Sequence, residues 1–185
     1  ALGTATALGR ELPILGVAGD QQSALVGQGC VRPGMAKITF GTGAFALAVT
    51  DGRVAAPNVI SAIGWRGPAG RVFAADGGIY TAGAAVEWLM RLGLLEHVDA
   101  LSQLDGTPAA SRGVHFVPAL SGLGCPHWDR SAAGLWIGLD AATRRDDLVK
   151  SVLEGVAFRA AEVLDALGAA PGRVISVDGG LTKCR

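Results

Sequence analysis

The 185-residue sequence is poor in cysteine, in charged side chains and in long apolar runs. Its three cysteines, Cys30, Cys125 and Cys184, are odd in number and far apart, which argues against a disulfide framework and indicates reduced thiols in a cytoplasmic protein. Because 16 Lys and Arg balance 16 Asp and Glu, nucleic acid is not an expected partner. No apolar run approaches the ~20 residues that cross a bilayer. The first residues lack the pattern of a secretory signal, so neither a membrane location nor secretion is expected.

The sequence is rich in apolar residues and in glycine. Hydrophobic residues make up 50% of the chain and charged residues 17%, so the chain can bury a core and is not expected to be disordered. Its length suits one domain or slightly more. The 28 glycines are about twice the average usage. They cluster at a few places instead of following a collagen-like repeat, so those places are candidates for special backbone geometry.

Hydrophobic spacing predicts a chain of strands and helices. An apolar run over residues 14–18 ends at Asp20, and a helix is predicted to follow over residues 21–29. Short apolar segments between turn residues predict strands over residues 35–40, 44–50, 59–65, 71–75, 114–118, 134–139 and 173–177. Helical spacing predicts helices over residues 79–95, 99–104 and 143–167. Thr143 and Asp146 resemble a capping box for the last of these helices, and Gly168 is its predicted stop.

Three glycine turns are candidates for phosphate binding. They are Gly41-Thr42-Gly43, Gly77-Gly78 together with Gly83, and Gly179-Gly180. A glycine at the end of a strand lets backbone N–H groups approach an anion because no Cβ stands in the way. Taken singly, each motif is better explained as a simple β-turn, and a lone pair of glycines is weak support for a nucleotide site.

Asp20 is the candidate catalytic residue. A carboxylate at the end of a strand can accept a proton from a substrate hydroxyl, and the neighbouring amide of Gln21 can hold a second hydroxyl. Taken alone, Asp20 is better explained as the cap of the helix that follows it. The two roles are compatible, because a capping aspartate is held in a fixed orientation.

Other polar residues favour structural roles. Cys125-Pro126-His127 has no second Cys/His pair at ligand spacing, so no metal site is expected. Glu154 lies near an apolar helical face. The favoured interpretation is a structural carboxylate that bonds to another group of the protein. Trp128 and Asp129 are expected to anchor their loop by packing and by bonds to local backbone amides.

Several motifs in a fixed order carry a resemblance to a known family. They comprise residues 19–25 (GDQQSAL), 33–45 (PGMAKITFGTGAF), 82–89 (AGAAVEWL), 116–129 (FVPALSGLGCPHWD), 134–154 and 178–180 (DGG). Taken together, they resemble the FGGY carbohydrate kinases, and most of all the members that phosphorylate glycerol. The resemblance covers nearly the whole chain.

The resemblance implies an α/β fold of the actin-like ATPase, ribonuclease-H-like kind, with a mixed sheet flanked by helices. FGGY kinases have two such domains, which close over ATP and a polyol or sugar. Residues 1–185 resemble part of the C-terminal, nucleotide-side domain, and the N-terminal domain is absent. That missing domain is therefore an expected partner, and the chain alone is expected to have negligible kinase activity.

The resemblance also assigns roles to individual positions. Asp20 matches the catalytic base and contacts the substrate, Gln21 matches a ligand of a substrate hydroxyl, and Phe45 matches an aromatic wall beside the substrate. The positions that match nucleotide contacts are Gly41, Thr42, Gly83, Glu87, Gly179, Gly180 and Cys184. Glu87 stands where a Gln is usual, and Cys184 stands where an Asn is usual.

The expected activity is transfer of the γ-phosphoryl group of ATP, with Mg²⁺, to a primary hydroxyl, with glycerol as the best single acceptor. The enzymatic alternative is an FGGY kinase for a pentulose or tetritol. A non-catalytic, actin-like nucleotide-binding module is the alternative from another class. A second copy of the chain remains a candidate partner, because apolar surface is expected where the missing domain would close.

Overall fold

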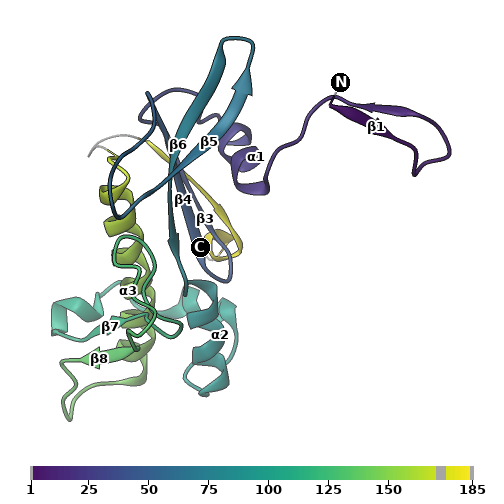
Figure 1. Cartoon of the computed structure of the whole chain (residues 1–185). Coiled ribbons are helices and arrows are strands. Elements are labelled where there is room, and N and C mark those ends of the chain that lie inside the picture. Colours follow the sequence, from purple (N-terminus) through teal and green to yellow (C-terminus); the bar gives the residue numbers. More distant parts are fainter. Residues whose placement is uncertain (1, 170–173, 184–185) are drawn as a thin grey trace.

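The computed structural model describes residues 2–169 and 174–183, and its centre is a five-stranded mixed sheet (Figure 1). Its strands, in their order across the sheet, are β5 (Ile60–Gly67), β6 (Gly70–Ile79), β4 (Ala44–Thr50), β3 (Ala36–Phe40) and β9 (Ile175–Gly179). The first four strands pair antiparallel, and β9 pairs parallel to β3. The sequence predicts each of these strands, with ends that differ by up to four residues, and the mixed sheet confirms the predicted fold class.

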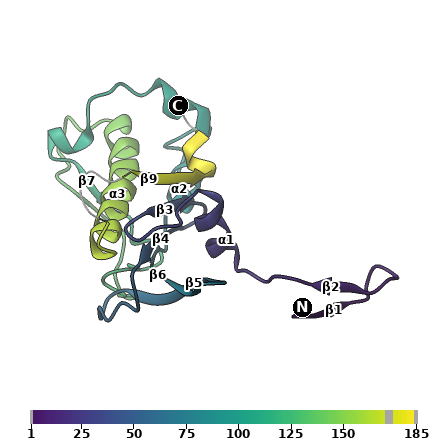
Figure 2. The same cartoon turned by 90° about the horizontal axis from the view of Figure 1, so that it is seen from above.

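Helices cover both faces of this sheet. The long helix α3 (Arg145–Ala166) and α2 (Gly83–Arg91) pack on one face, and α1 (Asp20–Gly27) packs on the other. Figure 2 shows α3 and α1 on opposite sides of the sheet. The α3 side holds the larger core, which includes Ile38, Ala46, Ala75, Val152 and Val163. The α1 side holds a smaller one: Leu25, Cys30, Leu47, Val49 and Ala74.

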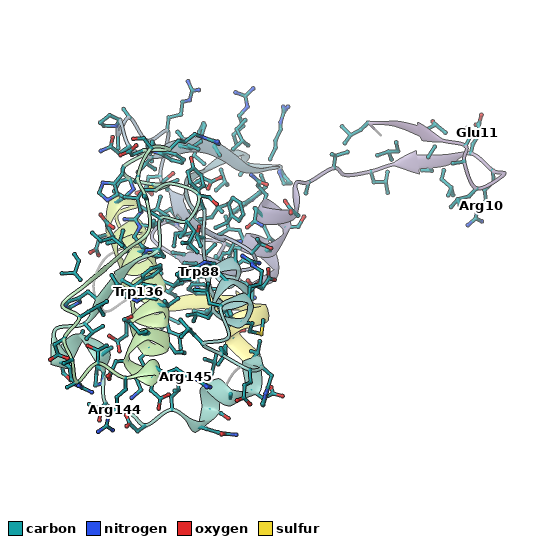
Figure 3. The ribbon with its side chains drawn as sticks, turned by 90° about the horizontal axis from the view of Figure 1, so that it is seen from below. Arg10, Glu11, Trp88, Trp136, Arg144 and Arg145 are labelled. Atoms are coloured by element: carbon teal, nitrogen blue, oxygen red, sulfur yellow. The ribbon has the colours of Figure 1, made fainter. Side chains whose placement is uncertain are left out.

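A small second sheet lies against α3. The short strands β7 (His115–Val117) and β8 (Leu135–Ile137) pair antiparallel. Three 3₁₀ turns complete the described elements: η1 (Val98–Gln103), η2 (Ala109–Arg112) and η3 (Gly180–Lys183). Trp88 of α2 stacks on Trp136 of β8 with ring centroids 5.2 Å apart, and Figure 3 labels both. This aromatic packing ties α2 to the small sheet.

The first residues form a hairpin that stands away from the sheet. Strands β1 (Gly3–Ala5) and β2 (Leu12–Ile14) pair with each other, and Figure 3 shows Arg10 and Glu11 at the far end of this hairpin. The predicted apolar strand over residues 14–18 is therefore wrong beyond Ile14. Residues 15–19 are exposed and pair with no strand among the described residues, so Asp20 begins a helix without closing a strand.

The capping box predicted for α3 differs in position. The capping box of α3 lies one residue later than Thr143 and Asp146, because the carboxylate of Asp147 accepts the backbone N–H of Arg144 at 2.8 Å. Thr143 instead accepts the N–H of Asp140 at 2.8 Å in the preceding turn. Gly168 has a φ of 72° just after α3, as expected for a helix stop.

The glycine pair at residues 77–78 was predicted to be a turn, but it lies inside β6. A Cβ on Gly77 would lie 2.7 Å from Cγ1 of Val163 and 2.9 Å from Sγ of Cys125. The absence of a side chain at Gly77 therefore lets the sheet approach α3 closely. This glycine has a packing role, and a strand reversal is not needed to explain it.

Gly155 in the middle of α3 offers a test of this close packing. A Cβ at this position would lie 2.3 Å from the carbonyl oxygen of Phe116 in β7. Gly155→Ala should therefore destabilise the protein by about 1–3 kcal/mol, although alanine favours a helix. Gly27→Ala in α1, where a Cβ meets nothing within 4 Å, is the matched control and should be neutral or stabilising. Urea unfolding of both variants compares them, and a stabilising Gly155→Ala would contradict the packing.

Candidate functional site

A cleft beside the β3–β4 turn gathers most of the predicted nucleotide residues. It has a volume of about 210 Å³ and lies between the turn, α2 and the start of η3. Its lining includes Gly41, Thr42, Gly83, Glu87 and Gly180. These residues come from three segments that are far apart in the sequence, so the fold brings together five of the seven predicted positions.

The β3–β4 turn rests on the N-terminal end of α2. The backbone N–H of Gly83 donates to the carbonyl of Gly41 at 2.9 Å, and the N–H of Ala84 donates to the carbonyl of Thr42 at 3.0 Å. A Cβ on Gly83 would lie 2.6 Å from the Gly41 carbonyl oxygen. Gly83 therefore has a packing role, which fixes the turn, while the side chain of Thr42 stays exposed at the cleft.

The two glycines at the end of β9 differ in their surroundings. Gly179 has a φ of 105°, and a Cβ there would lie 2.1 Å from the carbonyl oxygen of Phe40. It is therefore needed for the pairing of β9 with β3. Gly180 is exposed and lines the cleft, and a Cβ on it would meet nothing within 4 Å. Cys184, the remaining predicted position, lies outside the described residues.

Asp20 and Gln21 lie in the first turn of α1. Gly19 is the residue before the helix, so Asp20 is its first residue and not its N-cap. The carboxylate Oδ1 of Asp20 accepts the backbone N–H of Gln21 at 2.8 Å, which fixes the orientation of the exposed acid. The orientation expected from the capping hypothesis is therefore kept, and the carboxylate remains open to a ligand.

Phe45 lies on the same face of the sheet as α1. Across the strands, Thr39 pairs with both Phe45 and Asp178, and Phe45 pairs with Gly78. Residues that lie opposite each other in paired strands share a face. The Phe45 ring is 46% exposed, and its Cε1 lies 3.7 Å from where a Cβ of Gly78 would be. Gly78 thus leaves room for a half-exposed aromatic surface beside the polar residues.

The sequence analysis missed Lys37, which is fully buried in β3 on this same face. Its ammonium group donates to Oε1 of Gln21 and, at 2.7 Å, to Oγ1 of Thr39. Burial lowers the pKa of Lys37, and the carboxylates of Asp178, Asp76 and Asp20 oppose that effect. A lysine at an inward-facing position of an apolar strand was the available signal.

Asp178 and Asp76 are the other charged groups that sequence reasoning left out of the site. A hydrogen bond from the Thr39 hydroxyl is the main cause of the lowered pKa of Asp178. A hydrogen bond from Gln28 and the charge of Lys37 lower this pKa further. The Nε2 of Gln28 donates to Oδ2 of Asp178 at 2.9 Å. We define Asp20, Gln21, Lys37, Thr39, Phe45, Asp76 and Asp178 as the acceptor face.

Burial raises the pKa of Asp76, and Lys37 only partly opposes this. A carboxyl group whose folded pKa is raised stabilises the fold at low pH and loses that contribution as pH rises through its folded pKa. The wild type should therefore lose stability as the pH rises from about 4 to about 7.5, and Asp76→Asn should not. The thermal midpoint of the variant relative to the wild type should increase over that range. Thermal midpoints at both pH values measure this difference. A constant difference between the two proteins would contradict the role of burial at Asp76.

Other polar residues have structural partners, as predicted. The carboxylate of Glu154 accepts the backbone N–H groups of Ala109 and Ala110 at 2.7 and 2.9 Å, which caps η2. Trp128 donates to the carbonyl of Asn58 at 2.9 Å, and Asp129 accepts the N–H of Ser131 at 2.8 Å. These contacts hold the 119–134 loop in place.

Within residues 2–169 and 174–183, no group of three or more His, Cys, Asp or Glu side chains is arranged to hold a metal ion. In the same part of the chain, no helix combines the length and apolarity needed to cross a bilayer.

One hairpin joins the cleft to the acceptor face. Strands β3 and β4 carry Lys37, Thr39 and Phe45, and the turn between them carries Gly41 and Thr42. The arrangement suits transfer of a group between a molecule in the cleft and one on the acceptor face.

Comparison with known proteins found a matching family model and similar proteins. A family model described as the C-terminal domain of the FGGY family of carbohydrate kinases matches residues 36–185. A glycerol kinase from Gloeobacter violaceus is 43% identical over 182 residues, which are 95% of this chain and 37% of that protein. The chain thus spans little more than a third of the length of such relatives.

Solved structures of related kinases share the fold. A glycerol kinase from Plasmodium falciparum, crystallised with ADP, matches with a TM-score of 0.84 at 34% identity, over 94% of this chain and 36% of that one. A xylulose kinase from Rhodospirillum rubrum matches with a TM-score of 0.72 at 26% identity, over 91% of this chain and 34% of that one. Both matches cover about a third of the solved chain.

Proposed function

Because this chain belongs to the FGGY family of carbohydrate kinases, we propose that it is the nucleotide-side, C-terminal part of a two-domain kinase that transfers the γ-phosphoryl group of ATP to a polyol. The single observation that carries the proposal is the hairpin β3–β4, which joins a glycine-lined cleft to a face bearing an open carboxylate. An N-terminal domain would supply the rest of the acceptor site and close over both ligands.

Asp20 is the proposed general base. Its carboxylate would accept the proton of the acceptor hydroxyl as that oxygen bonds to the γ-phosphorus and the bond from the γ-phosphorus to the bridging oxygen of ADP breaks. The bond from the Gln21 N–H to Oδ1 holds the carboxylate at the start of α1. Gln21 and Phe45 would position the acceptor, through a hydrogen bond and through contact with its carbon chain respectively.

The cleft is proposed to hold ATP. Thr42 would donate its hydroxyl to the terminal phosphate, and the open space beside Gly180 would admit the nucleotide. Glu87 lies on α2 at the same cleft and would face the base or ribose. Mg²⁺ would offset phosphate charge, and in kinases this ion is commonly held by phosphates, water and one or two carboxylates.

Glycerol is the proposed acceptor, supported by the identity of 43% to a glycerol kinase. A pentulose is the second candidate, because a xylulose kinase shares the fold at 26% identity. A non-catalytic nucleotide-binding module is the candidate from another class, and the identity of 43% to a glycerol kinase favours the enzyme over it. The buried, unpaired Cys30 and Cys125 and the use of ATP support a cytoplasmic location.

The proposal is tested by ADP release from the full-length kinase with glycerol, erythritol and xylulose as acceptors. We expect the highest kcat/KM with glycerol and no turnover from residues 1–185 alone, because half of the acceptor site would be missing. Turnover by residues 1–185 alone would contradict the two-domain proposal. A higher kcat/KM with xylulose would replace glycerol by the second candidate, and ATP binding without any transfer would favour the non-catalytic module.

A further inference from the structure

The acceptor face contains a buried cation whose purpose the phosphoryl transfer itself does not explain. Lys37 has an exposed fraction of 0% although it carries an ammonium group. Burying such a charge is costly unless it is paired and hydrogen-bonded. Its two hydrogen-bond acceptors are side chains, Gln21 and Thr39, and both lie on the acceptor face.

The contact with Lys37 determines which way the Gln21 amide points. An ammonium group has only donors, so the amide atom that faces it must be the carbonyl oxygen, Oε1. The Nε2 group, with two N–H donors, is then directed away from Lys37. Without this contact, the amide could rotate and offer its oxygen to a ligand as readily as its N–H groups.

We propose that Lys37 is a positioning residue of the acceptor site: it holds Oε1 of Gln21 so that the Nε2 group donates to a hydroxyl oxygen of the acceptor. The inference rests on the proposed function, in which Asp20 and Gln21 contact the acceptor. Asp20 accepts the proton of one hydroxyl, and its neighbour Gln21 donates to the oxygen of another. The pair therefore selects acceptors that carry two neighbouring hydroxyl groups.

The surroundings of Lys37 favour a fixed position. Thr39 lies two residues along β3 on the same face and accepts a second bond from the ammonium at 2.7 Å. The carboxylates of Asp178, Asp76 and Asp20 all attract the charge. With one acceptor on its own strand and another on α1, Lys37 links the helix that bears the proposed base to the sheet.

A double-mutant cycle in the full-length kinase tests the inference, with glycerol as the acceptor. Lys37→Met and Gln21→Ala should each raise the KM for glycerol about 10-fold, the scale of one charge-assisted hydrogen bond. The double variant should be within about twofold of Gln21→Ala alone, because Lys37 acts through Gln21. The KM for ATP should stay within about twofold in all variants. Gln22→Ala, the neighbouring glutamine without a contact to Lys37, is the matched control and should keep the KM for glycerol.

Additive effects of Lys37→Met and Gln21→Ala on the KM for glycerol would overturn the inference, because they would place Lys37 in an independent structural role. Such a result would leave the proposed acceptor site intact. An unchanged KM for glycerol in Gln21→Ala would overturn both the inference and the proposed acceptor contact.

A second variant tests whether Gln21 donates to the acceptor, even if Lys37→Met does not fold. Gln21→Glu keeps an oxygen for Lys37 to bind, but it offers the acceptor only oxygen and no N–H donor. An acid is also well tolerated in the first turn of a helix. We expect the KM for glycerol to rise about 10-fold. A KM equal to that of the wild type would show that Gln21 does not donate to the acceptor and would overturn the inference.

Discussion

Replacing Asp20 with asparagine in the full-length kinase is expected to lower kcat by roughly 10²- to 10⁴-fold, the usual contribution of a positioned general base. The amide keeps the shape of the side chain and can still accept the backbone N–H of Gln21. It cannot take up the proton of the acceptor hydroxyl. The KM for ATP should change little, because Asp20 is not among the residues that line the nucleotide cleft.

Asp51→Asn is the matched control for this experiment. Asp51 is an exposed aspartate just after β4, at the opposite end of that strand from the cleft. It should keep the wild-type kcat. A wild-type kcat in Asp20→Asn would reduce Asp20 to a helix-terminal residue and would remove the base from the proposed mechanism.

A valine at Gly180 is expected to weaken ATP binding about 10- to 100-fold, the cost of forcing extra methyl groups into a filled site. In the structure, a Cβ on Gly180 has no neighbour within 4 Å, so the side chain is accommodated without the nucleotide. It would project into the cleft that also contains Thr42 and Glu87. Polyol binding should be unaffected. Calorimetric titration with a non-hydrolysable ATP analogue measures the change in Kd.

Gly67→Val provides the steric control, because Gly67 at the end of β5 also has no neighbour within 4 Å of its added Cβ but lies away from the cleft. It should bind the ATP analogue as the wild type does. Equal affinity in Gly180→Val and the wild type would remove Gly180 from the nucleotide site and leave it as a simple bend between β9 and η3.

Local sequence signals were sufficient for the central hairpin and the long helix. Short apolar segments on both sides of Gly41-Thr42-Gly43 predict β3 and β4 almost to their ends, because the apolar segments and the glycine turn both point to a hairpin. The apolar stripe of residues 148–167 and Gly168 predict α3 for the same reason. The candidate Asp20 and the glycines of the cleft were found through motifs; the fold gathers Gly41, Gly83 and Gly180 at the cleft and puts Asp20 at the start of α1.

Features that depend on tertiary contacts could not be predicted in this way. The buried position of Lys37 is set by Gln21 and Thr39, and only the folded helix α1 brings Gln21 to β3. Gly77 was taken for a turn because a missing side chain has the same signature whether it allows a bend or a close approach to Val163. Residues 15–19 are apolar enough for a strand, but no strand in the described part of the chain pairs with them.

A crystal structure of the full-length kinase with a non-hydrolysable ATP analogue and glycerol tests the assignment of the two sites most directly. We expect one primary hydroxyl oxygen of glycerol within about 3 Å of the Asp20 carboxylate and in line with the terminal phosphorus. The terminal phosphate should lie at Thr42, and the nucleotide should pass beside Gly180. Glycerol bound away from α1, or the nucleotide bound outside the cleft between Gly41 and Gly180, would contradict the proposed roles of both sites.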